Sequence, residues 1–114
     1  MATYTKELLS GSTDGAPIGI AATSTPGTLI HTADLTALDE VYIYAVNTSA
    51  SDVTLTVEFG GVGAADLVPM KIKKDAGLTL VIPGTALTGA KVVGAYAGVS
   101  SVINIQGWVN RITL

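Results

Sequence analysis

Residues 41–61 read VYIYAVNTSASDVTLTVEFGG, and this stretch decides the fold class of the chain. Its second half alternates between an apolar and a polar set of side chains: Val53, Leu55, Val57 and Phe59 against Thr54, Thr56 and Glu58. A period of two residues predicts a β-strand with its apolar side on a core and its polar side in water. The run TSAS at 48–51 predicts a hairpin turn that joins this strand to the one before it.

The first half of the same stretch is apolar on both sides. Its two alternating sets of side chains are Val41, Ile43 and Ala45, and Tyr42, Tyr44 and Val46. If the first set faces the core, the two tyrosines and the valine of the second set emerge on the outer face of the sheet. Aromatic side chains are enriched at the cores of protein interfaces, so we expect another surface to cover this face.

The rest of the chain repeats the β pattern. Short runs rich in Val, Ile, Thr and Tyr are separated by clusters of Gly, Pro, Asn, Asp and Ser. Strands are expected at residues 17–23, 28–32, 40–47, 52–59, 66–73, 77–82, 91–96 and 101–112. A turn about every 8–12 residues predicts a single-domain, all-β antiparallel sandwich of about eight strands, jelly-roll or immunoglobulin-like. Pro69 predicts that its strand lies at a sheet edge or is bulged.

The first fifteen residues differ from the remainder. They contain Gly, Ser, Thr and Asp but little β pattern after Leu9. We therefore predict an N-terminal arm at residues 1–15, mobile unless something holds it, and a β-sandwich domain at 16–114.

Composition narrows the function classes. The chain has 114 residues, of which 48% are hydrophobic and only 13% charged, about half the usual charged fraction of soluble domains. Its net charge of -3 argues against a nucleic-acid partner, because binding to phosphates needs a concentrated basic surface. With no cysteine, the chain has neither disulfides nor thiolate metal sites.

Neither a membrane span nor a signal peptide is predicted. Residues 92–110 carry no charge, but their serines, asparagines, glutamine and glycines make them too polar for a spanning helix. Residues 1–15 contain no apolar core of the kind that signal peptides have. We therefore expect a soluble protein made in the cytoplasm, with no membrane partner.

The segment HTADLTALDE at 31–40 is the one cluster of candidate catalytic or metal-binding groups: His31, Asp34, Asp39 and Glu40. It could hold a metal or carry out acid–base chemistry, or it could be a polar loop that caps a β element. We favour the polar loop, because the spacing matches no known ligand geometry.

Two other functional motifs are absent from the sequence. No serine lies in G-x-S-x-G, and FGGVGAAD at 59–66 lacks the third glycine of a dinucleotide loop. The sequence therefore predicts no catalytic residue, no metal site, no cofactor and no enzymatic activity.

A carbohydrate-binding module is the alternative to protein association. Such modules stack sugars on exposed rings, and the candidates are Tyr42, Tyr44, Tyr96 and Trp108. Aromatic residues make up only 5% of the chain, so we rank sugar binding second.

Four short segments carry a resemblance to a known class of proteins: DEVY at 39–42, NTS at 47–49, VIPG at 81–84 and GWVNRI at 107–112. Over residues 27–112 the chain resembles small all-β virion proteins of tailed bacteriophages, of the capsid decoration or cement type. The resemblance implies a structural protein on the virion head surface, without an active site. It implies binding to the major capsid protein lattice, or a position in the tail or neck as the alternative.

Self-association is also expected, with a trimer or higher ring favoured. The candidate protein–protein interface consists of Tyr4, Tyr42, Tyr44, Val46 and Trp108. A neighbouring subunit, the N-terminal arm or the capsid is expected to cover it.

Overall fold

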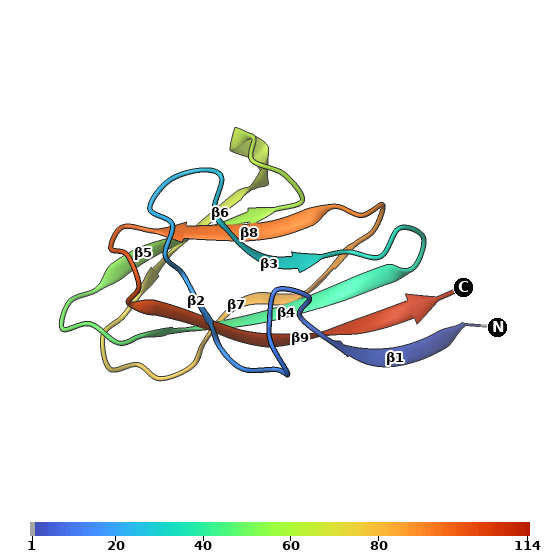
Figure 1. Ribbon diagram of the computed structural model, residues 1–114, viewed down its shortest axis with the longest axis horizontal. Coiled ribbons are helices and arrows are strands. Elements are labelled where there is room, and N and C mark those ends of the chain that lie inside the picture. The colour runs from blue at the N-terminus through green and yellow to red at the C-terminus, as the bar shows by residue number, and fades with distance from the viewer. Residues whose placement is uncertain (1) are drawn as a thin grey trace.

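The computed structural model describes residues 2–114 and is a sandwich of two antiparallel β-sheets (Figure 1). Sheet A contains β1 (Thr3–Leu8), β2 (Ile18–Gly19), β4 (Leu38–Asn47), β7 (Thr79–Leu87) and β9 (Ile103–Thr113). Sheet B contains β3 (Thr28–Thr32), β5 (Val53–Phe59), β6 (Leu67–Ile72) and β8 (Val92–Ala97). One 3-10 turn, η1 (Ala64–Asp66), connects β5 to β6. The prediction of an all-β sandwich is confirmed.

The strand order is that of a jelly roll. Sheet A runs β1-β9-β4-β7, with β2 also paired to β9, and sheet B runs β3-β8-β5-β6. The pairs are therefore nested: β2 with β9, β3 with β8, β4 with β7 and β5 with β6. A long hairpin rolled into two sheets gives this nesting, so of the two expected topologies the observed order is the jelly roll.

The core lies between the two sheets and follows the alternation in the sequence. Val41, Ile43 and Ala45 of β4 are fully buried, as are Leu55 and Val57 of β5. Burying each of the larger apolar side chains contributes about 1.5–3 kcal/mol. The assignment of these positions to the core face is confirmed.

Most strand boundaries lie within a few residues of the prediction. Pro69 lies in β6, which forms one edge of sheet B, as its missing N–H donor predicts. Two strands differ: β2 is only two residues long, and β7 continues past Pro83 to Leu87.

Within the described part of the chain no helix is long and apolar enough to cross a bilayer.

Most of the segment predicted as an N-terminal arm lies against the sandwich. Thr3–Leu8 form β1, which pairs along the last residues of β9 from Thr3–Thr113 to Leu8–Trp108. After β1, Leu9 is buried and the N–H of Gly11 donates to the carbonyl of Ile30. Backbone pairing with β9 therefore holds residues 3–8 of the predicted arm against the sandwich, although this segment has no clear apolar alternation. Met1 of the predicted arm lies outside the described residues.

Two residues expected in water are buried. Thr56 and Glu58 point away from the core, yet they are only 8% and 3% exposed. The connection from β2 to β3 runs over the outer face of sheet B, where the N–H of Gly27 donates to Glu58 (Figure 1). The alternation along β5 predicts that its polar side chains face solvent. It cannot predict that a loop from elsewhere in the chain covers them.

Candidate functional site

The outer face of sheet A brings together side chains from three adjacent strands. Directly paired residues of antiparallel strands share a face, so the pairs Leu8–Trp108 and Tyr42–Trp108 place all three residues on one side. The remaining outward positions follow by alternation along β1, β4 and β9. All five candidate interface residues lie on this face: Tyr4, Tyr42, Tyr44, Val46 and Trp108.

We call the apolar part of this surface the aromatic face, which consists of Tyr4, Leu8, Tyr42, Tyr44, Val46, Leu80 and Trp108. Three of these side chains are strongly exposed: Tyr4 at 66%, Leu8 at 56% and Leu80 at 44%. Leu8 and Leu80 are additions to the five residues expected from the sequence. Their place on the face follows from pairing with Trp108 and Tyr44, which are distant in sequence.

A stack of side chains crosses the aromatic face from one edge of the sheet to the other. The rings of Tyr42 and Trp108 lie 4.2 Å apart between centroids, with 14° between their planes. On the β1 side, Nζ of Lys6 lies 4.6 Å from the centroid of the Trp108 ring. On the β7 side, the Tyr42 ring lies against Gly84. Cation–π and aromatic stacking contacts of this kind fix the rings in place.

This stack limits how a sugar could bind. Because β1 and β4 lie on opposite sides of β9, Lys6 and Tyr42 cover opposite faces of the Trp108 ring. A sugar stacks on a free ring face, whereas the Lys6 ammonium and the Tyr42 ring both lie over the Trp108 ring. The fourth ring proposed for sugar binding, Tyr96, lies on β8 of sheet B and so is not part of this surface.

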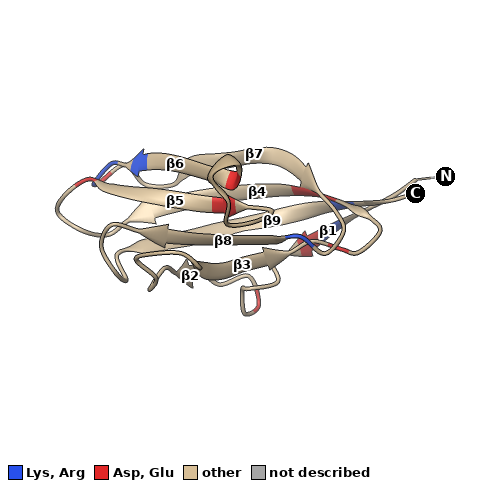
Figure 2. Cartoon of the chain, turned by 90° about the horizontal axis from the view of Figure 1, so that it is seen from above, with Lys and Arg blue, Asp and Glu red and all other residues tan. Residues whose placement is uncertain are grey.

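Charged residues lie mainly at strand ends and in loops, and long stretches of both sheets carry none (Figure 2). On the outer face of sheet A, the amide of Asn110 donates to the Glu40 carboxylate at 2.8 Å. Glu40 therefore points away from His31, which lies inside the sandwich. The predicted four-residue cluster is thus divided between two faces.

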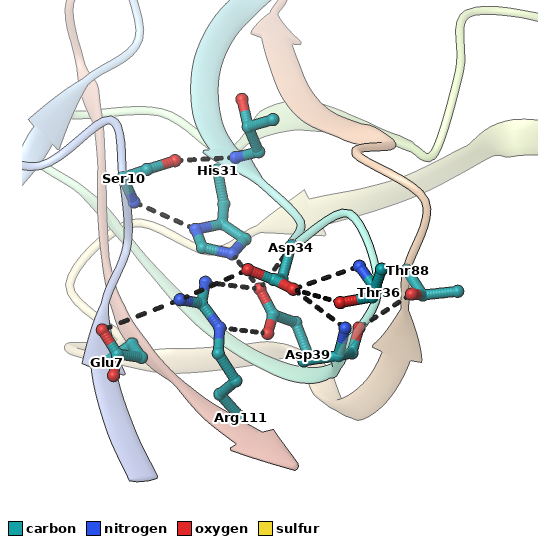
Figure 3. A network of polar contacts seen from close by, with 10 residues as sticks. Glu7, Ser10, His31, Asp34, Thr36, Asp39, Thr88 and Arg111 are labelled. Carbon is teal, nitrogen blue, oxygen red and sulfur yellow. Dashed lines mark hydrogen bonds and ion pairs between the residues drawn. The ribbon is translucent and has the colours of Figure 1, made fainter. Parts of the chain in front are cut away.

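The other candidates of the cluster meet in a network around the buried carboxylate of Asp39 (Figure 3). Nε2 of His31 lies 2.8 Å from Oδ2 of Asp39, and Nε of Arg111 donates to Oδ1 of Asp39 at 2.8 Å. The backbone N–H of Asp34 also donates to this carboxylate, at 3.2 Å. The sequence does not reveal Arg111 as a member, because it lies 72 residues from Asp39 and meets it only through the β4–β9 pairing.

The hydrogen bonds of His31 define its role. The backbone N–H of Ser10 donates to Nδ1 at 3.0 Å, so Nε2 carries the ring proton and donates it to Asp39. The Ser10 hydroxyl oxygen accepts a hydrogen bond from the N–H of Thr32 at 2.7 Å. His31 and Asp39 are 1% and 0% exposed, so the hydrogen bond between them lies inside the protein and connects β3 to β4.

The hydrogen bonds and charges of the network determine which of its side chains are ionised at neutral pH. Burial acts to raise the pKa of Asp39, but hydrogen bonds from Arg111, His31 and the Asp34 backbone outweigh it, and the pKa lies below its ordinary 3.8. Backbone N–H groups of Ala37 and Thr36 likewise hold the pKa of Asp34 below 3.8. The hydrogen bonds to Asp39 raise the pKa of Arg111 further above neutrality. The ionised pair is therefore the stable form at neutral pH.

In residues 2–114, no group of three or more His, Cys, Asp or Glu side chains is arranged to hold a metal ion. Comparison with protein-family models, with curated proteins and with solved structures gives no match to this chain.

Proposed function

We propose that the chain is a non-enzymatic structural protein of a tailed-phage virion that decorates the head surface. The observation that carries the proposal is the aromatic face, on which Tyr4 and Leu8 are more than half exposed. An exposed apolar face of this kind marks a surface that binds another protein. The resemblance over residues 27–112 supplies the assignment to the virion. The jelly-roll topology does not decide it, because viral capsid and lectin domains share that topology.

The occupant proposed for the aromatic face is a second copy of the chain, in a trimer or higher ring. Interface cores are rich in Tyr and Trp, and the aromatic face contains three tyrosines and the tryptophan of the chain. A net charge of -3 also leaves little repulsion between copies. The major capsid protein is then bound through a different surface of the ring.

Sedimentation equilibrium with matched variants tests the association. Tyr44→Lys places a charge on the aromatic face, and Thr54→Lys places the same charge at an exposed position of β5 on sheet B. We expect the natural chain and Thr54→Lys to form the same oligomer and Tyr44→Lys to dissociate, with unfolding midpoints nearly unchanged. A monomeric natural chain, or equal loss of assembly and folding in Tyr44→Lys, would show that the aromatic face is not a subunit interface.

Co-sedimentation with phage heads tests the virion assignment separately. The expected result is saturable binding of the natural chain to undecorated tailed-phage heads. Binding to isolated tails or necks instead would support the alternative position in the virion. Binding to neither particle, together with a glycan-array signal that is lost in Trp108→Ala, would favour the carbohydrate-binding function.

A further inference from the structure

A second surface feature lies on the opposite side of the sandwich, on the outer face of sheet B. Gly94 of β8 is paired with Leu29 of β3 on one side and with Glu58 of β5 on the other. These three residues share one face, and the middle one has no side chain. The outer face of sheet B therefore dips between Leu29 and Glu58. A Cβ on Gly94 would lie only 2.9 Å from Oε1 of Glu58, so the glycine makes room for this carboxylate.

Glu58 is the one charged residue that lines the depression, and it is 3% exposed. Its Oε1 accepts a hydrogen bond from the N–H of Gly27 at 2.8 Å, and its Oε2 accepts one from the hydroxyl of Thr25. Both donors are neutral, and Glu58 takes part in none of the ion pairs formed within residues 2–114. A buried carboxylate without a cation is costly, so a positive charge placed beside it is stabilised.

The remaining lining is apolar. The depression forms a cavity of about 120 Å³ that is open to solvent, and its lining consists of Pro26, Gly27, Leu29, Glu58, Gly61, Val62, Val92 and Gly94. Leu29, Val62 and Val92 are each about half exposed, so they form an apolar rim around the opening. An apolar protein cavity of about 150 Å³ is large enough for benzene, so this one admits a group of about five or six heavy atoms.

We propose that this pocket binds an alkylammonium group, with the alkyl part against the apolar rim and the nitrogen beside the Glu58 carboxylate. Each carboxylate oxygen has a second lone pair that can accept an N–H from the ammonium. A lysine side chain of another protein chain and a small free alkylamine both present this chemistry. The pocket lies on the face opposite the aromatic face, so the proposal does not rest on the proposed function.

Ligand titrations followed by ¹H–¹⁵N correlation spectra test the proposal. The natural chain is titrated with n-butylammonium chloride and, in parallel, with n-butanol, which has the same alkyl chain but no charge. Sodium chloride at matched concentration controls for ionic strength. We expect saturable shifts at the amides of Gly27, Leu29 and Gly94, with affinity at least about tenfold higher for butylammonium than for butanol.

Two variants locate the charge that matters. Glu58→Gln keeps the size of the side chain and is expected to abolish the preference for butylammonium. Glu40→Gln removes a carboxylate from the opposite face and is expected to leave the preference unchanged. If Glu58→Gln does not give a folded spectrum, the comparison of the two ligands on the natural chain decides the question. Equal affinity for both ligands, or no shifts at the pocket amides, overturns the proposal.

A third ligand distinguishes the two sources of the amine. N-acetyl-lysine N-methylamide carries the same ammonium group on a peptide backbone. Binding of this ligand as strong as that of butylammonium supports a lysine of a protein partner as the occupant. Binding of butylammonium alone supports a small free amine.

Discussion

The ring of Tyr42 fills the space that a side chain at residue 84 would occupy. A Cβ built on Gly84 would lie 2.6 Å from Cζ of Tyr42, and Gly84 has a φ of +93°. Glycine is thus required at residue 84 for two reasons. Its φ is positive, and a larger side chain would collide with the Tyr42 ring. The contact connects β7 to β4 on the outer face and holds Tyr42 against Trp108.

This relationship predicts that Gly84→Ala is more damaging than the same substitution at another glycine of positive φ whose surroundings are open. Gly89 also has positive φ, at +69°, but a Cβ there meets nothing within 4 Å. We expect Gly89→Ala to lower the free energy of unfolding by about 1–2 kcal/mol, and Gly84→Ala to lower it by about 1 kcal/mol or more beyond that. Urea denaturation of both variants measures the difference. Equal losses would mean that the Tyr42 ring moves away without cost.

Two adjacent leucines test whether the N-terminal segment belongs to the folded body. Leu8 is 56% exposed at the end of β1, whereas Leu9 is 2% exposed. We expect Leu9→Ala to lower the free energy of unfolding by about 3 kcal/mol, because a buried leucine leaves a cavity. Leu8→Ala is expected to cost less than about 1 kcal/mol. A small, equal effect of both in urea denaturation would indicate that residues 1–15 are an independent arm.

The buried carboxylate of Asp39 predicts a large effect of a small chemical change. Asp39 accepts hydrogen bonds from Arg111, His31 and the N–H of Asp34, and the amide introduced by Asp39→Asn would turn its own N–H donors toward one of these groups. We expect Asp39→Asn to lower the free energy of unfolding by about 3 kcal/mol. The exposed Asp52 serves as the matched control, and Asp52→Asn should cost less than about 1 kcal/mol. Similar losses in the two variants would contradict a structural role for the network.

The sequence predicted what repeats locally and missed what depends on distant pairing. Alternation placed Val41 and Ile43 in the core and Tyr42 outside, because a strand in a two-layer sandwich has one face on each side. Local periodicity could not reveal that β1 pairs with the far end of β9, or that Arg111 reaches Asp39 across that sheet. It also could not show that the β2–β3 connection covers Glu58. Each of these contacts joins segments that are far apart in the sequence, and no local pattern in either segment indicates its partner.

The same Asp39 carboxylate predicts how stability depends on pH. Its pKa in the folded protein lies below the ordinary 3.8, so the unfolded chain binds the proton more tightly. The stabilisation is therefore fully present above the unfolded value and is lost as the pH falls through 3.8 and then through the folded pKa. The pKa values of Asp34 and Asp52 are shifted in the same direction, so several carboxylates contribute to the loss.

We expect the free energy of unfolding of the natural chain to fall as the pH drops below about 5. In Asp39→Asn the fall is smaller, because one of the shifted carboxylates is missing. The difference in stability between the two proteins should therefore shrink as the solution becomes more acidic. Urea denaturation of both proteins at several pH values measures it. A difference that stays constant over this range would mean that Asp39 does not change its protonation on unfolding, contrary to the hydrogen bonds that Arg111 and His31 donate to it.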